Sequence, residues 1–135
     1  MGWRIDWDLR VLGDELRFPA VPASVVVVRR LLDELLDNLG WPKRRAGEVC
    51  LAVTEACANA VTHASPLELQ GDMVVTVQAF GDILVVRVRD YGGGFNPGRP
   101  TAGMGLGLGL IRTLSDSASI VDAEPGVLVQ MKFRL

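Results

Sequence analysis

Residues 73–89 read MVVTVQAFGDILVVRVR, and this stretch decides which kind of fold the chain can form. Valine alternates with polar residues on both sides of Gly81-Asp82, which is the period of a strand with one buried and one solvated face. Gly-Asp is also a good two-residue hairpin turn. The stretch therefore predicts two antiparallel strands, Met73–Phe80 and Ile83–Arg89.

The residues before this hairpin have the period of helices. Apolar side chains recur at helical spacing over Val25–Leu39, with Ser24 as the predicted N-cap and Gly40 as the residue just past the end. A second helix is predicted over Pro42–Ala64, because proline suits the first helical turn. Upstream of both helices, Glu15–Phe18 is predicted to be a short strand.

The residues after the hairpin are rich in glycine and then return to strands. Residues 90–111, DYGGGFNPGRPTAGMGLGLGLI, hold eight of the fifteen glycines, and a helix is predicted around Leu106–Ser115. Two strands follow at Ala118–Ala123 and Val127–Leu135, turned by Glu124-Pro125-Gly126. Helices, a hairpin, a helix and a second hairpin predict an α+β fold, a mostly antiparallel sheet covered on one face by helices.

Composition indicates one domain in an intracellular protein. The chain has 135 residues and a net charge of −2, which gives no reason to expect nucleic acid or an anionic membrane as the main partner. Residues 1–6 are charged from the start, and no apolar run approaches the roughly 20 residues of a membrane span. Cys50 and Cys57 lie about 10 Å apart on one predicted helix, so we expect free, buried thiols in a cytoplasmic protein.

The first cluster with chemical potential is EACANAVTH, residues 55–63. Glu55, Asn59 and His63 stand at i, i+4 and i+8, so they form one stripe along a helix. Such a stripe can simply be the solvent face of an amphipathic helix. Small apolar residues flank it, however, and asparagine is a poor interior helix former, so the stripe can instead face a cleft. Asparagine and glutamate oxygens together suit Mg²⁺.

The second cluster is the aspartate that follows the valine hairpin. Asp90 precedes Tyr91 and three glycines, and an aspartate in this position is commonly part of a turn. Its carboxylate can also accept a hydrogen bond from an exocyclic amine such as that of adenine. Gly92 and Gly94 would allow a flat ring to approach the backbone closely.

The third cluster alternates glycine with apolar residues over Gly103–Leu110. Leucine argues against a flexible linker, because its side chain favours burial. A glycine-rich turn that opens a helix presents free N–H groups, which can bind phosphate. The cluster lacks the Gly-Lys-Ser/Thr of a P-loop. It also lacks the last glycine of a dinucleotide fingerprint, where Leu108 or Leu110 stands.

In this order, the three clusters resemble the N, G1 and G2 boxes of the GHKL (Bergerat-fold) ATPases, at residues 55–63, 90–94 and 103–107. The compact length, the P-A-S at the first helix and the closing hairpin are similar to the bacterial anti-sigma factor serine/threonine kinases. The resemblance covers about residues 15–135 and leaves 1–14 as an N-terminal extension. It implies a two-layer α/β sandwich that binds ATP with Mg²⁺, with a short lid at residues 95–102.

The resemblance also implies roles for individual residues. Asn59 would coordinate Mg²⁺ and Glu55 would be the general base or orient the nucleophile. Asp90 would recognise the adenine amine, with Gly92 and Gly94 letting the base pack. The residues expected to lie near the phosphates are His63, Gly103, Gly105, Leu106 and Gly107.

For function, the resemblance implies a homodimeric kinase that sequesters a sigma factor and phosphorylates Ser or Thr of an anti-anti-sigma (STAS-type) partner. Glu55 favours this activity. Val127 stands where the family usually has a threonine near adenine, and Ala64-Ser65-Pro66 replaces its usual aromatic or glycine-rich continuation. Val127 favours the alternative, a nucleotide-binding anti-sigma switch without kinase activity.

A histidine-phosphorylating domain and a nucleotide-free structural domain are further alternatives. No dimerisation helix with a substrate histidine is present to support the former, and the coincidence of three boxes argues against the latter.

Overall fold

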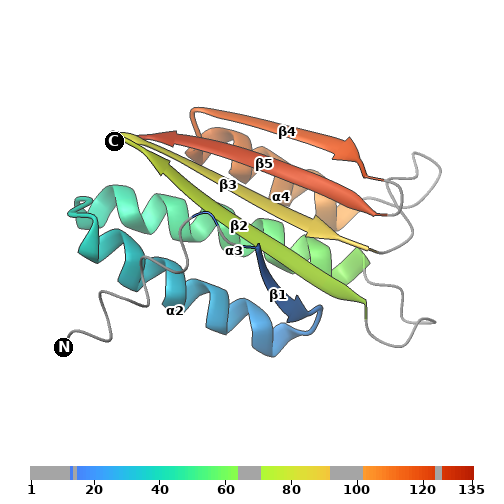
Figure 1. Ribbon diagram of the computed structural model, residues 1–135. Coiled ribbons are helices and arrows are strands. Elements are labelled where there is room, and N and C mark those ends of the chain that lie inside the picture. The colour runs from blue at the N-terminus through green and yellow to red at the C-terminus, as the bar shows by residue number, and fades with distance from the viewer. Residues whose placement is uncertain (1–12, 14, 64–70, 92–101, 124–125) are drawn as a thin grey trace.

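The computed structural model describes residues 13, 15–63, 71–91, 102–123 and 126–135. Within them, the strands form a five-stranded antiparallel sheet in the order β1-β2-β3-β5-β4. The helices cover one face of this sheet (Figure 1). The predicted α+β class and two-layer arrangement are confirmed. The elements in chain order are β1 (Glu15–Pro19), α2 (Pro22–Asn38), α3 (Lys43–His63), β2 (Asp72–Phe80), β3 (Ile83–Asp90), α4 (Ala102–Leu114), β4 (Ser117–Asp122) and β5 (Val127–Arg134).

The valine-rich hairpin lies at the centre of the sheet. Phe80 pairs with Ile83 across a turn in which Gly81 has φ +62°, a conformation that glycine adopts without steric cost. On its other edge, β3 pairs with β5. Alternate residues of these strands point toward the helices and are fully buried, Val86 and Met131 among them. The alternation read from the sequence therefore correctly predicts which face is covered.

Helix α3 is the central helix, because it packs against α2, α4 and the sheet. Its buried side is made mostly of small residues, which lets the helix lie close to the strands. Cys50 and Cys57 are both buried and free, as predicted. Burial raises the pKa of the Cys50 thiol to about 11 and that of Cys57 to about 12, so both stay protonated near neutral pH. The buried residues of α3 are Ala46, Val49, Cys50, Ala52, Val53, Ala56, Cys57 and Ala60.

The two ends of α2 show one correct and one wrong prediction. Gly40 has φ +79°; its N–H donates to Asp37 (3.1 Å), and the next N–H, of Trp41, donates to Leu36 (3.0 Å), which is a Schellman ending. Ser24 is not the N-cap. The helix begins at Pro22, which is already set for the first helical position, and the Ser24 hydroxyl donates backward to the Pro19 carbonyl at 2.6 Å. None of the helices in the described part of the chain has the length and apolar character needed to cross a membrane.

Candidate nucleotide site

Helix α3 brings two of the predicted site residues to one face. Glu55 and Asn59 lie one helical turn apart, and both are half-buried. The Nδ2 atom of Asn59 is buried and has no hydrogen-bond partner among the described residues. Leaving such a group unpaired costs on the order of 1–3 kcal/mol, so a buried orphan calls for a specific explanation. A ligand that binds beside Asn59 would supply one.

Asp90 approaches the same place from the sheet. It is the last residue of β3, pairs with Met73 of β2 and is only 4% exposed. Along the strand it alternates in phase with Val86 and Val88, which face the helices. The carboxylate therefore points into the interface between sheet and helices. An aspartate that only formed a turn at the strand end would not need to point there.

Asn59 and Asp90 line one small cavity between the sheet and the helices. Its volume is about 10 Å³, room for roughly one water. Ligand pockets typically measure about 300–1,000 Å³, so the residues that line this cavity do not by themselves enclose a purine. All of the other lining residues are apolar: Ala56, Ala60, Val88, Leu108, Ile120, Val127 and Val129.

Val127 is therefore part of the cavity wall, and it is 2% exposed. The residue that departs from the family pattern thus shares a cavity with Asp90, the residue expected to recognise the base. With valine there, the wall offers no hydroxyl to a base or to a water beside it. Among the described residues that line the cavity, Asp90 and Asn59 are the ones with polar side chains.

The residues fit a magnesium ion only if the phosphates and water complete its shell. No group of three His, Cys, Asp or Glu side chains able to hold a metal is present in the described residues. Asn59 can still offer an oxygen, because a half-turn of the carboxamide exchanges its oxygen with Nδ2. One or two oxygen ligands from the protein are the usual share for Mg²⁺ bound with a nucleotide.

Helix α4 begins earlier than predicted. It starts at Ala102 rather than near Leu106, so most of the glycine-rich cluster is helical and does not form a turn. In a regular helix only the N–H groups of the N-cap and of the first three helical residues lack partners, and in α4 those three helical residues are Ala102, Gly103 and Met104. Gly103 and Gly105 lie in the first turn of α4 and not in a turn before it. The N–H groups of Leu106 and Gly107 lie in the second turn, where helix hydrogen bonds use them.

Other predicted site residues cannot be placed against this cavity. His63 is the last residue of α3, and its side chain lies outside the described residues, as do Gly92 and Gly94. Gly126 was expected only as part of a turn, yet a Cβ there would stand 1.8 Å from the carbonyl oxygen of Asp90. Sequence spacing gave no signal for this contact, because it joins two hairpins across 36 residues.

A family model of the histidine kinase-like ATPase domain matches residues 18–133. The chain therefore belongs to this family. Among curated proteins, it is 34% identical to the serine-protein kinase RsbW of Bacillus velezensis, over 87% of this chain and 82% of the relative. It is 31% identical to the RsbW of Bacillus subtilis over the same shares of the two chains. The resemblance to the serine kinase branch is thus confirmed.

Two solved structures have the same fold. One contains the RsbU and RsbW domains of a Mycobacterium tuberculosis protein, with a TM-score of 0.68 and 20% identity over 91% of this chain. The other is the histidine kinase domain of a blue-light-activated kinase from Erythrobacter litoralis, with a TM-score of 0.54 and 25% identity over 70% of this chain. The chain spans 33% of the first structure and 46% of the second.

Proposed function

We propose that the chain is an ATP-dependent protein serine/threonine kinase and anti-sigma factor. It sequesters a sigma factor and phosphorylates a Ser or Thr hydroxyl of an anti-anti-sigma (STAS-type) protein, acting as a homodimer in the cytoplasm. The proposal that the chain binds ATP rests on one observation. The amide of Asn59, whose Nδ2 has no partner, and the buried carboxylate of Asp90 line one cavity whose other described lining residues are apolar. The names of the RsbW relatives support the kinase part.

Each residue has a chemical task in this proposal. The Asp90 carboxylate accepts a hydrogen bond from the adenine amine, inside walls that are otherwise apolar. The free N–H groups at the start of α4 hold phosphate oxygens, at the positive end of the helix dipole. Mg²⁺, held by Asn59 with the phosphates and water, would offset the negative charge of the transferred group.

Glu55 carries the proton transfer in this proposal. What supports the role is its place one turn before Asn59 on the same stripe of α3. In the reaction the substrate hydroxyl oxygen forms a bond to the γ-phosphorus while the bond from that phosphorus to the β–γ bridging oxygen breaks. Glu55 accepts the hydroxyl proton, and ADP leaves. A general base of this kind typically contributes about 10²–10⁴-fold to the rate.

The nucleotide site can be tested by calorimetric titration with ATP and Mg²⁺. We expect saturable binding that Asn59→Ala and Asp90→Asn each weaken at least about tenfold, the loss of one charge-assisted contact. Asn38→Ala and Asp82→Asn are matched controls, because both residues are exposed and lie away from the cavity. Failure of the unmodified protein to bind ATP at millimolar concentration would refute the proposal.

Phosphoryl transfer needs a separate test with a STAS-type protein as substrate. We expect Glu55→Gln to bind ATP normally and to phosphorylate the substrate at least about a hundredfold more slowly. ATP binding by the unmodified chain without any transfer would instead favour the switch that lacks kinase activity.

A further inference from the structure

Arg89 of β3 and Tyr91, which directly follows the strand, contact each other on the face of the sheet opposite the cavity. Arg89 points away from the helices because side chains alternate along a strand, and its contact with Tyr91 puts the ring on the same side. The guanidinium carbon of Arg89 lies 4.5 Å from the centre of the Tyr91 ring, within the range of a cation–π contact. This pair therefore supports the end of β3 on the face opposite the cavity, at the position of Asp90.

Arg89 also ties this strand end to the hairpin of β4 and β5. Its Nη2 donates to the carbonyl oxygen of Ala123 at 2.9 Å. The N–H of Ala123 in turn donates to Gly126 at 2.9 Å, so Ala123 belongs to the turn that leads into β5. The Nε of Arg89 is buried and has no hydrogen-bond partner among the described residues, so it is Nη2 that links the guanidinium to the turn.

The two segments that Arg89 joins are in close contact where the cavity begins. Gly126 packs on the backbone of Asp90 and Tyr91 with no space for a Cβ. The next residue, Val127, is a cavity wall. Arg89 therefore holds together the carboxylate that would read the base and the wall that would pack against it.

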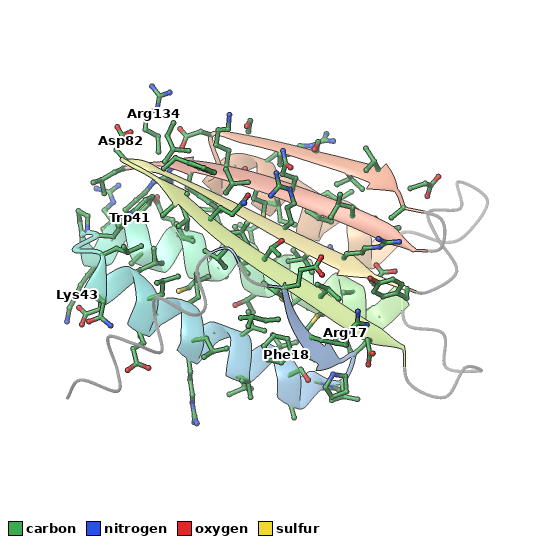
Figure 2. All side chains as sticks on the ribbon, viewed as in Figure 1. Arg17, Phe18, Trp41, Lys43, Asp82 and Arg134 are labelled. Carbon is green, nitrogen blue, oxygen red and sulfur yellow. The ribbon has the colours of Figure 1, made fainter. Side chains whose placement is uncertain are left out.

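Another arginine also reaches Tyr91, but less securely. Arg17 of β1 lies 5.7 Å from the ring centre and forms an ion pair with Asp72 (Figure 2). Its side chain is 58% exposed, so water competes for its charge. Arg89 is closer to the ring and is the one bonded to the turn.

We infer that Arg89 is a positioning residue for base recognition, acting on the Asp90 carboxylate through the strand backbone. The inference rests on the proposed function, in which Asp90 accepts a hydrogen bond from the adenine amine. Removing the Arg89 side chain breaks its hydrogen bond to the turn and its contact with Tyr91, while the backbone pairing of Arg89 with Leu128 remains. The end of β3 stays in the sheet, but the Asp90 carboxylate is held less firmly beside Val127. Contacts to the phosphates, at the start of α4, are made by other elements and stay as they were.

The matched control is Arg87, which lies two residues earlier on the same strand and the same face. It is also half-buried and hydrogen-bonded, but to the side chains of Gln130 (2.7 Å) and Gln78 (2.6 Å) and not to the turn. Both Arg89→Ala and Arg87→Ala thus remove an arginine from the open face of the sheet. Only the first removes the link to the site.

The experiment compares the affinities for ATP and for inosine triphosphate, which lacks the exocyclic amine, in the presence of Mg²⁺. We expect Arg89→Ala to raise the Kd for ATP about tenfold, the effect of one lost hydrogen bond, and to leave the Kd for inosine triphosphate unchanged. Arg87→Ala should keep the preference for ATP. Arg89→Lys retains a donor and a charge, so it should recover part of the preference for ATP. It also keeps the inference testable if the alanine variant does not fold.

Other outcomes overturn the inference. An equal loss of affinity for both nucleotides, or an equal loss in Arg87→Ala, would show a general structural effect. Equal binding of the two nucleotides by the unmodified protein would show that Asp90 does not read the amine. If the unmodified protein binds neither nucleotide, the proposed function itself fails, which is a result distinct from the others.

Discussion

At the scale of single residues, two turn glycines differ in what surrounds them. Gly81 and Gly126 both have positive φ, +62° and +93°, and each lies in the turn of a hairpin. Space is open around Gly81, whereas a Cβ on Gly126 would collide with the backbone of Asp90. Gly126→Ala therefore adds a steric clash to the cost of a left-handed conformation.

We expect Gly81→Ala to lower the free energy of unfolding by about 1–2 kcal/mol, the cost of the conformation alone. Gly126→Ala should lower it by about 3–5 kcal/mol, because the overpacking is added. Urea unfolding followed by circular dichroism measures both. Equal losses in the two variants would mean that the strands separate easily at Asp90, and the tight contact described here would not hold in solution.

At the scale of elements, helix α4 is intrinsically weak. Four of its thirteen residues are glycine, and each glycine costs a helix interior about 1 kcal/mol relative to alanine. Leu108 of α4 lines the cavity, so this weak helix lies directly beside the candidate site. At Gly109 a Cβ would meet no other atom within 4 Å, so packing does not require glycine there.

Gly109→Ala should therefore raise the free energy of unfolding by about 0.5–1 kcal/mol. Gly47→Ala on α3 is the matched control, since Gly47 is also exposed, helical and free of neighbours, and the same gain is expected there. Thermal unfolding of both variants checks this. A loss of stability in Gly109→Ala alone would indicate that the backbone conformation of α4 requires glycine at this position. Glycine would then not serve there to weaken the helix.

The elements themselves could largely be predicted from the sequence, because their hydrophobic periods are local. The strand alternation around Gly81 and the helical spacing after Ser24 need only neighbouring residues. The first and last residues of the helices were harder to predict. Pro22 and Ser24 both suit a helix start, and only the packing of the chain decides between them. At Leu106, the glycines suggested a turn although tertiary contacts can support a helix there.

At the scale of the whole molecule, contacts between distant residues were outside the reach of sequence patterns. The strand order β1-β2-β3-β5-β4 and the link from Arg89 to Ala123 join residues with no local relation. The same holds for part of the site. The shared stripe of Glu55 and Asn59 could be predicted from their helical spacing, and Asp90 from the glycines after it. The cavity that Asn59 and Asp90 share depends on how α3 lies on the sheet.

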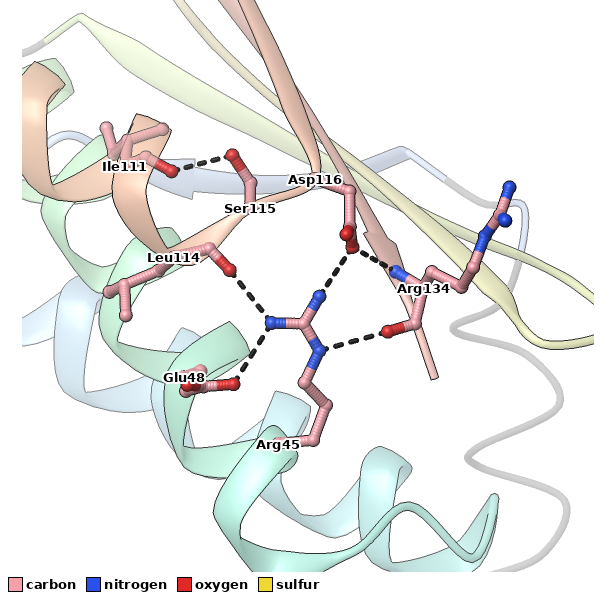
Figure 3. A network of polar contacts seen from close by, with 7 residues as sticks. All are labelled: Arg45, Glu48, Ile111, Leu114, Ser115, Asp116 and Arg134. Carbon is pink, nitrogen blue, oxygen red and sulfur yellow. Dashed lines mark hydrogen bonds and ion pairs between the residues drawn. The ribbon is translucent and has the colours of Figure 1, made fainter.

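Arg45 is the clearest example of a contact that joins the layers. From the first turns of α3 its guanidinium donates to the carbonyl oxygens of Leu114 (2.9 Å) and Arg134 (3.0 Å), and to the carboxylates of Glu48 (3.0 Å) and Asp116 (2.5 Å) (Figure 3). One side chain thus connects the end of α4, the start of β4 and the end of β5. In the sequence Arg45 stands in the basic run Lys43-Arg44-Arg45, and nothing in this local pattern points to the contacts.

Replacing Arg45 with methionine should therefore destabilise the whole domain and spare the nucleotide site. We expect a loss of about 2–4 kcal/mol in the free energy of unfolding, because two carbonyl oxygens lose a charged donor while the half-exposed carboxylates can rehydrate. The exposed neighbour Arg44 is the control, and Arg44→Met should change stability by less than about 0.5 kcal/mol. Arg45 precedes Asn59 by fourteen residues, about 20 Å along α3, so ATP affinity should stay within about twofold where the variant is folded. Loss of ATP binding by a folded Arg45→Met variant would mean that this end of the molecule controls the site, and that the layers do not respond independently.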